Sequence, residues 1–232
     1  MSGKLLKPPF FEIGPKQYLY GDEVLELARI ADEASEKHRV QVIFTAPFPD
    51  IRMVAQNTKN ILVFAPFMDD IPVGRGLADI LPESVKAAGA KGVLLNHVEK
   101  PLPFKKLEST VKRAKSLDML TLICADSIAE LKAAAFLHPD VLTAEPVDLI
   151  GGSKSGDLGY IRASIEAIRL VNADSYVLIG AGISSGEDVY RAIKEGADAS
   201  GSSGAIARAT DKRALMNEFL QAARQAWDER NG

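Results

Sequence analysis

Eight short apolar runs alternate with helix-patterned stretches along the whole chain, and this alternation constrains the fold more than any other feature. Most of the runs are apolar throughout, as strands buried on both faces of a parallel sheet are. Strand–helix units that recur at about 20–40 residues predict an α/β fold. The expected strands are Pro9–Gly14, Val40–Thr45, Ile61–Pro66, Gly92–His97, Leu120–Ala125, Val141–Glu145, Tyr176–Gly180 and Ala199–Ser202.

The stretches between these runs carry apolar side chains at helical spacing. One such face is Val24, Leu27, Ala31 and Ala34 after an expected cap at Asp22, and another is Leu215, Phe219, Ala222 and Ala226 after an expected cap at Asp211. Ser184 and Glu187 have the spacing of a capping box, before a helix with Val189, Ala192 and Ile193 on one face.

No linker or shift in composition interrupts the repeat, so we expect residues 1–232 to form a single domain. Eight units in one chain of 232 residues favour a compact closed (β/α)8 barrel. An open doubly wound sheet is the alternative.

Charge and cysteine content exclude several classes of protein. The chain has 28 basic and 31 acidic side chains, a net charge of −3, so it lacks the basic surplus that nucleic-acid binding requires. No apolar run approaches the roughly 18 residues of a membrane span. The single cysteine, Cys124, cannot form an internal disulfide, which favours a reducing compartment. We therefore expect a cytoplasmic protein with no nucleic-acid and no membrane partner.

In a (β/α)8 barrel the functional site lies at the carboxyl ends of the strands. Lys16, His97 and Glu145 follow or end the first, fourth and sixth expected strands. Each residue alone could be structural, but their coincidence at one face predicts three catalytic side chains. The GGSKS segment lacks the spacing of a P-loop, and the glycines after the seventh strand only approximate a dinucleotide fingerprint. We expect no cofactor and no metal.

Glycine-rich turns follow the seventh and eighth expected strands, where barrels of this type commonly bind a phosphate through backbone N–H groups. Residues 146–157 combine apolar side chains with glycines, a composition that suits a mobile lid. A small phosphorylated ligand is the expected guest. The residues expected to bind it are Ile150, Gly151, Gly180, Gly182, Ser203 and Gly204.

Three segments resemble the triosephosphate isomerase family, particularly its short archaeal-type form: LLNHVEK (94–100), TAEPVDLIGG (143–152) and VLIGAGISSGEDV (177–189). The resemblance implies a TIM (β/α)8 barrel that interconverts glyceraldehyde 3-phosphate and dihydroxyacetone phosphate. It implies that Glu145 is the base, that neutral His97 donates to the carbonyl oxygen, and that Lys16 stabilises the negative charge. It also implies a homodimer or homotetramer formed through the loop after the third strand, where residues 66–68 and 71–73 are apolar enough to pack on a partner or on their own barrel.

The chain departs from the family pattern at several positions. Gly14 stands in place of an asparagine, Val98 follows the histidine in place of a serine, Arg75 and Leu77 occupy the loop after the third strand, and the eighth strand is small and polar. These departures leave two alternatives open: an isomerase of another small sugar phosphate such as a tetrulose phosphate, and a non-catalytic phosphate-binding paralog. A Schiff-base aldolase that uses Lys16 is a third alternative, which does not depend on the departures.

Overall fold

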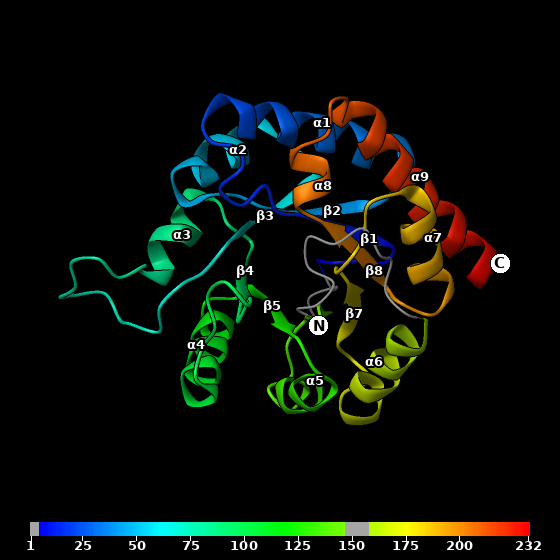
Figure 1. Ribbon diagram of the computed structural model, residues 1–232. Helices are drawn as coiled ribbons and strands as arrows, with labels where there is room; N and C mark the ends of the chain where they lie inside the picture. The colour runs from blue at the N-terminus through cyan, green and yellow to red at the C-terminus, as the bar shows by residue number, and fades with distance from the viewer. Residues whose placement is uncertain (1–4, 147–157) are drawn as a thin grey trace.

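The computed structural model describes residues 5–146 and 158–232. Within this part of the chain, parallel strands close into a barrel in which each strand pairs with the next and β8 pairs with β1 (Figure 1). The strands are β1 (Phe10–Ile13), β2 (Gln41–Thr45), β3 (Ile61–Ala65), β4 (Gly92–Leu95), β5 (Leu120–Ala125), β6 (Val141–Ala144), β7 (Tyr176–Ile179) and β8 (Ala199–Ser202). The predicted TIM (β/α)8 barrel is confirmed, and the open doubly wound sheet is wrong.

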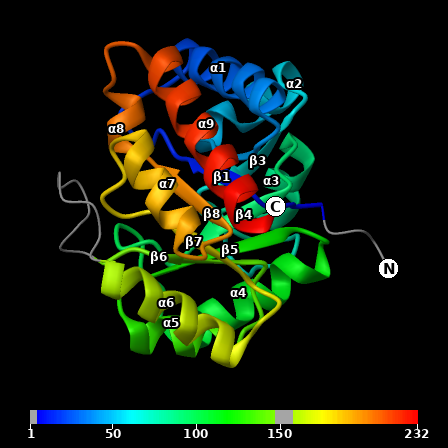
Figure 2. The same cartoon turned by 90° about the vertical axis from the view of Figure 1, so that its right-hand side faces the viewer.

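Helices surround the barrel, and α9 lies between α1 and α7 on its outside (Figure 2). The helices are α1 (Asp22–His38), η1 (Phe48–Asp50), α2 (Ile51–Asn57), α3 (Pro82–Ala88), α4 (Phe104–Ser116), α5 (Ile128–Ala135), α6 (Leu158–Val171), α7 (Gly186–Lys194), α8 (Gly204–Ala207) and α9 (Lys212–Asn231). None of the helices in the described ranges is long and apolar enough to cross a membrane.

The helix starts agree only in part with the predicted caps. Asp211 caps α9, because its side chain accepts a hydrogen bond from the Ala214 N–H. The predicted cap at Asp22 is wrong: Gly21 is the residue before α1, and its φ of 58° is a conformation that suits glycine. Asp22 lies instead in the first turn, where its negative charge still favours the helix dipole.

The capping box of α7 lies one residue later than the Ser184–Glu187 spacing predicts. Ser185 has an extended backbone, and its hydroxyl accepts from the Asp188 N–H while the Asp188 carboxylate accepts from the Ser185 N–H. The chain therefore enters the helix at Gly186, and Glu187 is left on the outer face.

Two apolar layers hold the barrel. The larger one lies between strands and helices and includes the stacked rings of Phe11 and Phe219, whose centroids are 5.3 Å apart. The smaller one fills the barrel interior, where Phe10, Phe64 and Leu122 are buried. The carboxyl ends of the strands, where the cavity described below lies, border this apolar interior.

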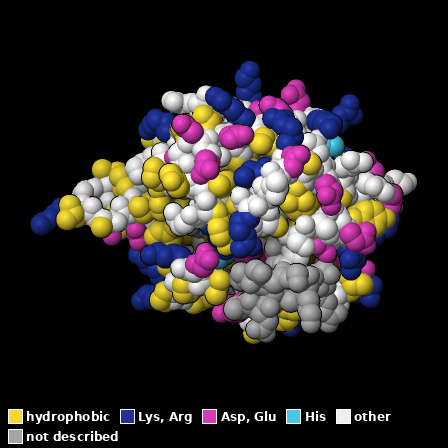
Figure 3. All heavy atoms as spheres, turned by 45° about the horizontal axis from the view of Figure 1, so that its top comes forward, with side chains coloured by type: hydrophobic (Ala, Val, Ile, Leu, Met, Phe, Trp, Pro, Cys, Tyr) yellow, Lys and Arg dark blue, Asp and Glu magenta, His cyan; other side chains and the backbone are white. Residues whose placement is uncertain are grey.

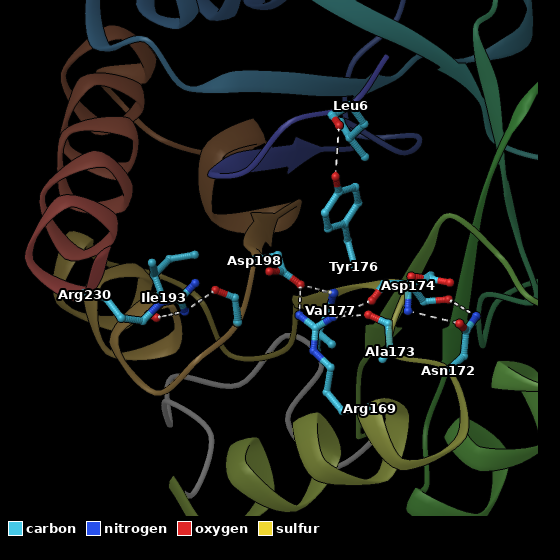
Figure 4. Close-up of polar contacts among 12 residues, drawn as sticks. Leu6, Arg169, Asn172, Ala173, Asp174, Tyr176, Val177, Ile193, Asp198 and Arg230 are labelled. Carbon is cyan, nitrogen blue, oxygen red and sulfur yellow. Dashed lines mark hydrogen bonds and ion pairs between the residues drawn. The ribbon is translucent and has the colours of Figure 1, made fainter. Parts of the chain in front are cut away.

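A polar network closes the opposite end of the barrel (Figure 4). Asp198, directly before β8, accepts hydrogen bonds from the Arg169 guanidinium and, at 2.8 Å, from the backbone N–H of Val177. Arg230, near the end of α9, donates to the carbonyl oxygens of Ile193 and Ala197. These contacts join α6, β7, β8 and the last helix.

A long excursion between β3 and α3 extends away from the barrel (Figure 1). Hydrophobic side chains cover much of this projection (Figure 3). Met68, near its base, is buried in the barrel's own core, whereas Val73 and Leu77 are exposed. Met68 therefore packs on its own barrel, and Val73 and Leu77 do not.

Candidate active site

Lys16, His97 and Glu145 line one cavity of about 640 Å³, at the carboxyl ends of the strands. The structure therefore brings the three side chains together at one cavity, as the sequence predicts. His97 Nε2 lies 3.8 Å from Glu145 Oε2, and Lys16 Nζ lies 3.4 Å from Glu99 Oε2. An imidazole, a carboxylate and an ammonium group thus face a shared space.

The His97 ring is oriented by the backbone that follows it. The N–H of Glu99 donates to His97 Nδ1 at 3.1 Å, so in the neutral ring the proton sits on Nε2, the nitrogen that faces Glu145. Burial lowers the pKa of His97; Glu145 and Glu99 oppose this shift and Lys16 adds to it. The imidazole is therefore a neutral hydrogen-bond donor at pH 7.

Unusual backbone conformations position Lys16 and, through the residue before it, His97. Lys16 and Asn96 both have positive φ, 48° and 59°, which side-chain-bearing residues adopt only where the surroundings hold them. The Asn96 side chain supplies such a constraint: its amide donates to the Cys124 carbonyl and its oxygen accepts from the Leu102 N–H, both at 3.0 Å. Asn96 directly follows β4 and presents His97 to the cavity.

Glu145 directly follows β6, and its N–H continues the ladder by donating to the Ala125 carbonyl. Its carboxylate lies against Gly180, at the end of β7. A Cβ at residue 180 would lie 2.7 Å from Glu145 Oε1, closer than atoms approach without moving. Gly180, predicted as a phosphate-binding residue, is seen here to make room for the carboxylate.

The turn after β7 contains Gly182 in a left-handed conformation, with φ of 74°. The amides that follow it are already occupied. The N–H groups of Ser184 and Ser185 donate to Asp188, and the N–H of Gly186 donates to Glu218 Oε1 at 2.6 Å. The backbone N–H groups at the start of α7 therefore already donate to carboxylates of the protein and are not free to bind an anion.

Of the residues predicted to bind phosphate, Ser203 lines the cavity, whereas Gly180, Gly182 and Gly204 do not. Ser203 Oγ donates to the carbonyl of Gly14 at 2.5 Å, which joins the ends of β8 and β1. Ile150 and Gly151, with the predicted lid, lie outside the described residues.

The guanidinium of Arg208 packs beside Gly204, since a Cβ there would lie 3.0 Å from Nη2, and it lies over the Tyr18 ring at 5.2 Å. Sequence reasoning missed this cation because it lies beyond the end of the short helix α8.

Strand β8 can be buried although it contains two serines, because both hydroxyl groups have hydrogen-bond acceptors. Ser200 Oγ donates to the Ile179 carbonyl at 3.0 Å, and Ser202 Oγ donates to the Ile183 carbonyl at 3.1 Å. Each hydroxyl therefore has an acceptor on β7 or on the turn after it, as buried polar groups require.

Sequence reasoning also missed Glu12, which lies on β1 and lines the same cavity. Thr45 Oγ1 donates to Glu12 Oε1 at 2.6 Å. Burial raises the pKa of Glu12 from its ordinary 4.5 to about 7; the Thr45 hydrogen bond and Lys16 oppose the shift, and Glu145 adds to it. A signal was present, because Glu12 is the one charged residue inside the otherwise apolar expected strand Pro9–Gly14.

Among the described residues no cluster of three or more metal-ligating side chains is placed to hold an ion. Cys124 also lines the cavity, and burial together with Glu145 and Glu12 raises the pKa of its thiol. The thiol is therefore protonated and is not a nucleophile at neutral pH.

Comparison with known proteins gives one consistent result. A model of the family described as triosephosphate isomerase matches residues 16–222. The chain is 32% identical to a triosephosphate isomerase of Saccharolobus solfataricus over 226 residues, which cover 95% of this chain and 99% of the relative. It is 34% identical to a triosephosphate isomerase of Metallosphaera sedula, over 97% of this chain and 100% of the relative. For one of Methanothermus fervidus the identity is 34%, over 86% and 91% of the two chains.

Proposed function

The chain belongs to the triosephosphate isomerase family, and on this premise we propose that it interconverts glyceraldehyde 3-phosphate and dihydroxyacetone phosphate through an enediol or enediolate. The observation that carries the proposal is the pairing of a neutral His97 Nε2–H with the Glu145 carboxylate, 3.8 Å apart at one cavity. Two groups at this separation can reach neighbouring atoms of one small substrate.

In the proposed reaction, Glu145 removes a proton from the carbon next to the carbonyl group. The Nε2–H of His97 donates to the carbonyl oxygen, which stabilises the charge that develops there as the C–H bond breaks. His97 passes its Nε2 proton to the former carbonyl oxygen and takes a proton from the hydroxyl group on the neighbouring carbon. The Glu145 carboxylic acid then returns its proton to that neighbouring carbon, so the carbonyl and hydroxyl groups exchange places. Lys16 adds a positive charge on the first-strand side of the cavity.

The phosphate group is assigned to the region of Gly182, Ser203 and Gly204. Because Asp188 and Glu218 already occupy the amides of residues 184–186, the phosphate binds nearer to Ser203 and Gly204 than to the start of α7. Arg208 supplies a cation beside Gly204. The predicted contributions of Ile150 and Gly151 remain part of this proposal.

Three further expectations also remain predictions: a single domain over residues 1–232, a cytoplasmic location, and a homodimer or homotetramer. The exposed Val73 and Leu77 support the last of these, because exposed apolar side chains on one projection suit an interface.

A coupled assay of triose phosphate isomerisation tests the function, with Glu145→Gln as the diagnostic variant. Glutamine keeps the shape but cannot accept the proton, so we expect kcat to fall by about 10²–10⁴ with KM little changed. Glu166→Gln, on the exposed face of α6, is the control and should retain full activity. Binding of a phosphate ester with no turnover by the wild type would instead support the non-catalytic paralog. Borohydride trapping on Lys16 would support the aldolase.

A further inference from the structure

Glu12 is a carboxyl group in the cavity wall that the proposed reaction does not use. Thr45 is its hydrogen-bond donor at Oε1, and within the described ranges Oε2 accepts no hydrogen bond and no cation lies within ion-pair distance. Enclosing a carboxyl group with so few partners costs free energy unless a ligand or a proton completes its surroundings. An apolar side chain at residue 12 would therefore cost less free energy than this carboxyl group does.

Two glycines make room for this carboxyl group. A Cβ at residue 14 would lie 3.2 Å from Glu12 Oε1, and a Cβ at residue 201 would lie 3.3 Å from Glu12 Oε2. The two glycines thus lie against a single side chain and form one local feature with it.

A second polar group of the same cavity also lacks a partner. Thr143 is almost completely buried, and its hydroxyl oxygen has no hydrogen-bond partner among the described residues. It lines the cavity from β6, two residues before Glu145 and therefore on the same face of the strand. Glu12 and Thr143 thus offer hydrogen-bonding capacity to the space that a substrate of Glu145 and His97 would occupy.

We propose that Glu12, held by Thr45 and assisted by Thr143, binds a chain hydroxyl of the substrate, so that the enzyme also isomerises four-carbon aldose and ketose phosphates. This inference rests on the proposed isomerase function, whose carbonyl and phosphate contacts come from other residues. A fourth carbon adds one hydroxyl group that needs a partner, and a cavity of about 640 Å³ leaves space for it. Glu12 would donate to that hydroxyl when protonated and accept from it when ionised.

The test compares kcat and KM for glyceraldehyde 3-phosphate, erythrose 4-phosphate and threose 4-phosphate, with ketose formation followed by NMR. The proteins are the wild type, Glu12→Val, Glu12→Gln and the control Glu36→Gln on the exposed face of α1. For Glu12→Val we expect a loss of about 10–100-fold in kcat/KM for at least one tetrose phosphate, the effect of one buried hydrogen bond, and less than about threefold for the triose. Glu12→Gln keeps an amide partner and should lose less.

The outcomes separate this inference from the proposed function. Turnover of the triose with none of either tetrose, or equal losses on all three substrates in both Glu12 variants, overturns the hydroxyl subsite and leaves the isomerase standing. Turnover of a tetrose but not of the triose, with the loss confined to Glu12 variants, supports the subsite and overturns the triose assignment. Thermal unfolding of each variant identifies a loss caused by the fold alone.

Discussion

At the scale of single residues, the position of Glu145 depends on the missing side chain at residue 180. In Gly180→Ala the new methyl group would lie 2.7 Å from Glu145 Oε1 and push the carboxylate aside. Because a base displaced by about 1 Å can lose about 10² in rate, we expect kcat to fall by that order while KM changes little. Steady-state kinetics measures both. Unchanged kcat in a folded variant would contradict the role given to this glycine.

Glu12 also makes a prediction about stability and pH. Its pKa is about 7 in the folded protein and near 4.5 when unfolded, so between these values the folded state holds the extra proton. The free energy of unfolding then falls as pH rises from about 4.5 to 7. Glu12→Gln removes this penalty, and we expect it to be more stable than the wild type by about 1–3 kcal/mol at pH 8.

Urea unfolding of Glu12→Gln and wild type at pH 8 and pH 4 measures this difference. At pH 4 both side chains are neutral, so the gain should disappear. Glu12 is only partly buried and contacts water in the cavity, so the expected gain in the free energy of unfolding includes values as low as about 1 kcal/mol. A gain of equal size at both pH values would show that packing, rather than ionisation, is responsible.

The sequence allowed Lys16, His97 and Glu145 to be predicted because each comes at the end of an apolar run, where a polar side chain stands out. Glu12 lies inside such a run, and its direction depends on how β1 faces the barrel interior. The tautomer of His97 could not be predicted either, since it depends on where the Glu99 N–H lies after the turn.

At the scale of elements, Asp198 joins β8 to β7 and α6 at the end of the barrel opposite the cavity. Asp198→Ala would leave the Val177 N–H without its acceptor and the Arg169 guanidinium without its carboxylate. We expect a loss of about 1–3 kcal/mol in the free energy of unfolding, since the Val177 N–H is buried and the Arg169 guanidinium is partly buried. Denaturant unfolding measures it, with Glu166→Ala as the exposed control. A change within about 0.5 kcal/mol would contradict this role.

Element positions were predictable to within two residues at each strand because the apolar runs are bounded by glycine, proline and polar residues. Helix starts were less predictable. Ser184 and Ser185 stand side by side, and both hydroxyls contact Asp188, so only the backbone conformation of Ser185 decides which one caps α7. Gly21 before α1 shows the same limit.

At the scale of the whole molecule, the projection between β3 and α3 predicts the oligomeric state. Val73 and Leu77 are exposed on it, and their burial against a partner would contribute about 1.5–3 kcal/mol each. We expect the wild type to be a dimer or tetramer by light scattering, and the double variant Val73→Asp, Leu77→Asp to be a monomer. Leu170→Asp, at an exposed site on α6, is the control. A monomeric wild type would contradict the prediction.

The pairing of β8 with β1 has a consequence for biosynthesis. The first strand leaves the ribosome early, yet the strand that covers its free edge ends at Ser202 and is translated near the end of the message. Ser203, which bonds to Gly14, and Glu218, which bonds to Gly186, are translated later still. A nascent chain therefore carries an uncovered strand edge during most of its synthesis, when unpaired edges favour aggregation. Chains truncated before β8 should consequently require a chaperone that the full-length product does not.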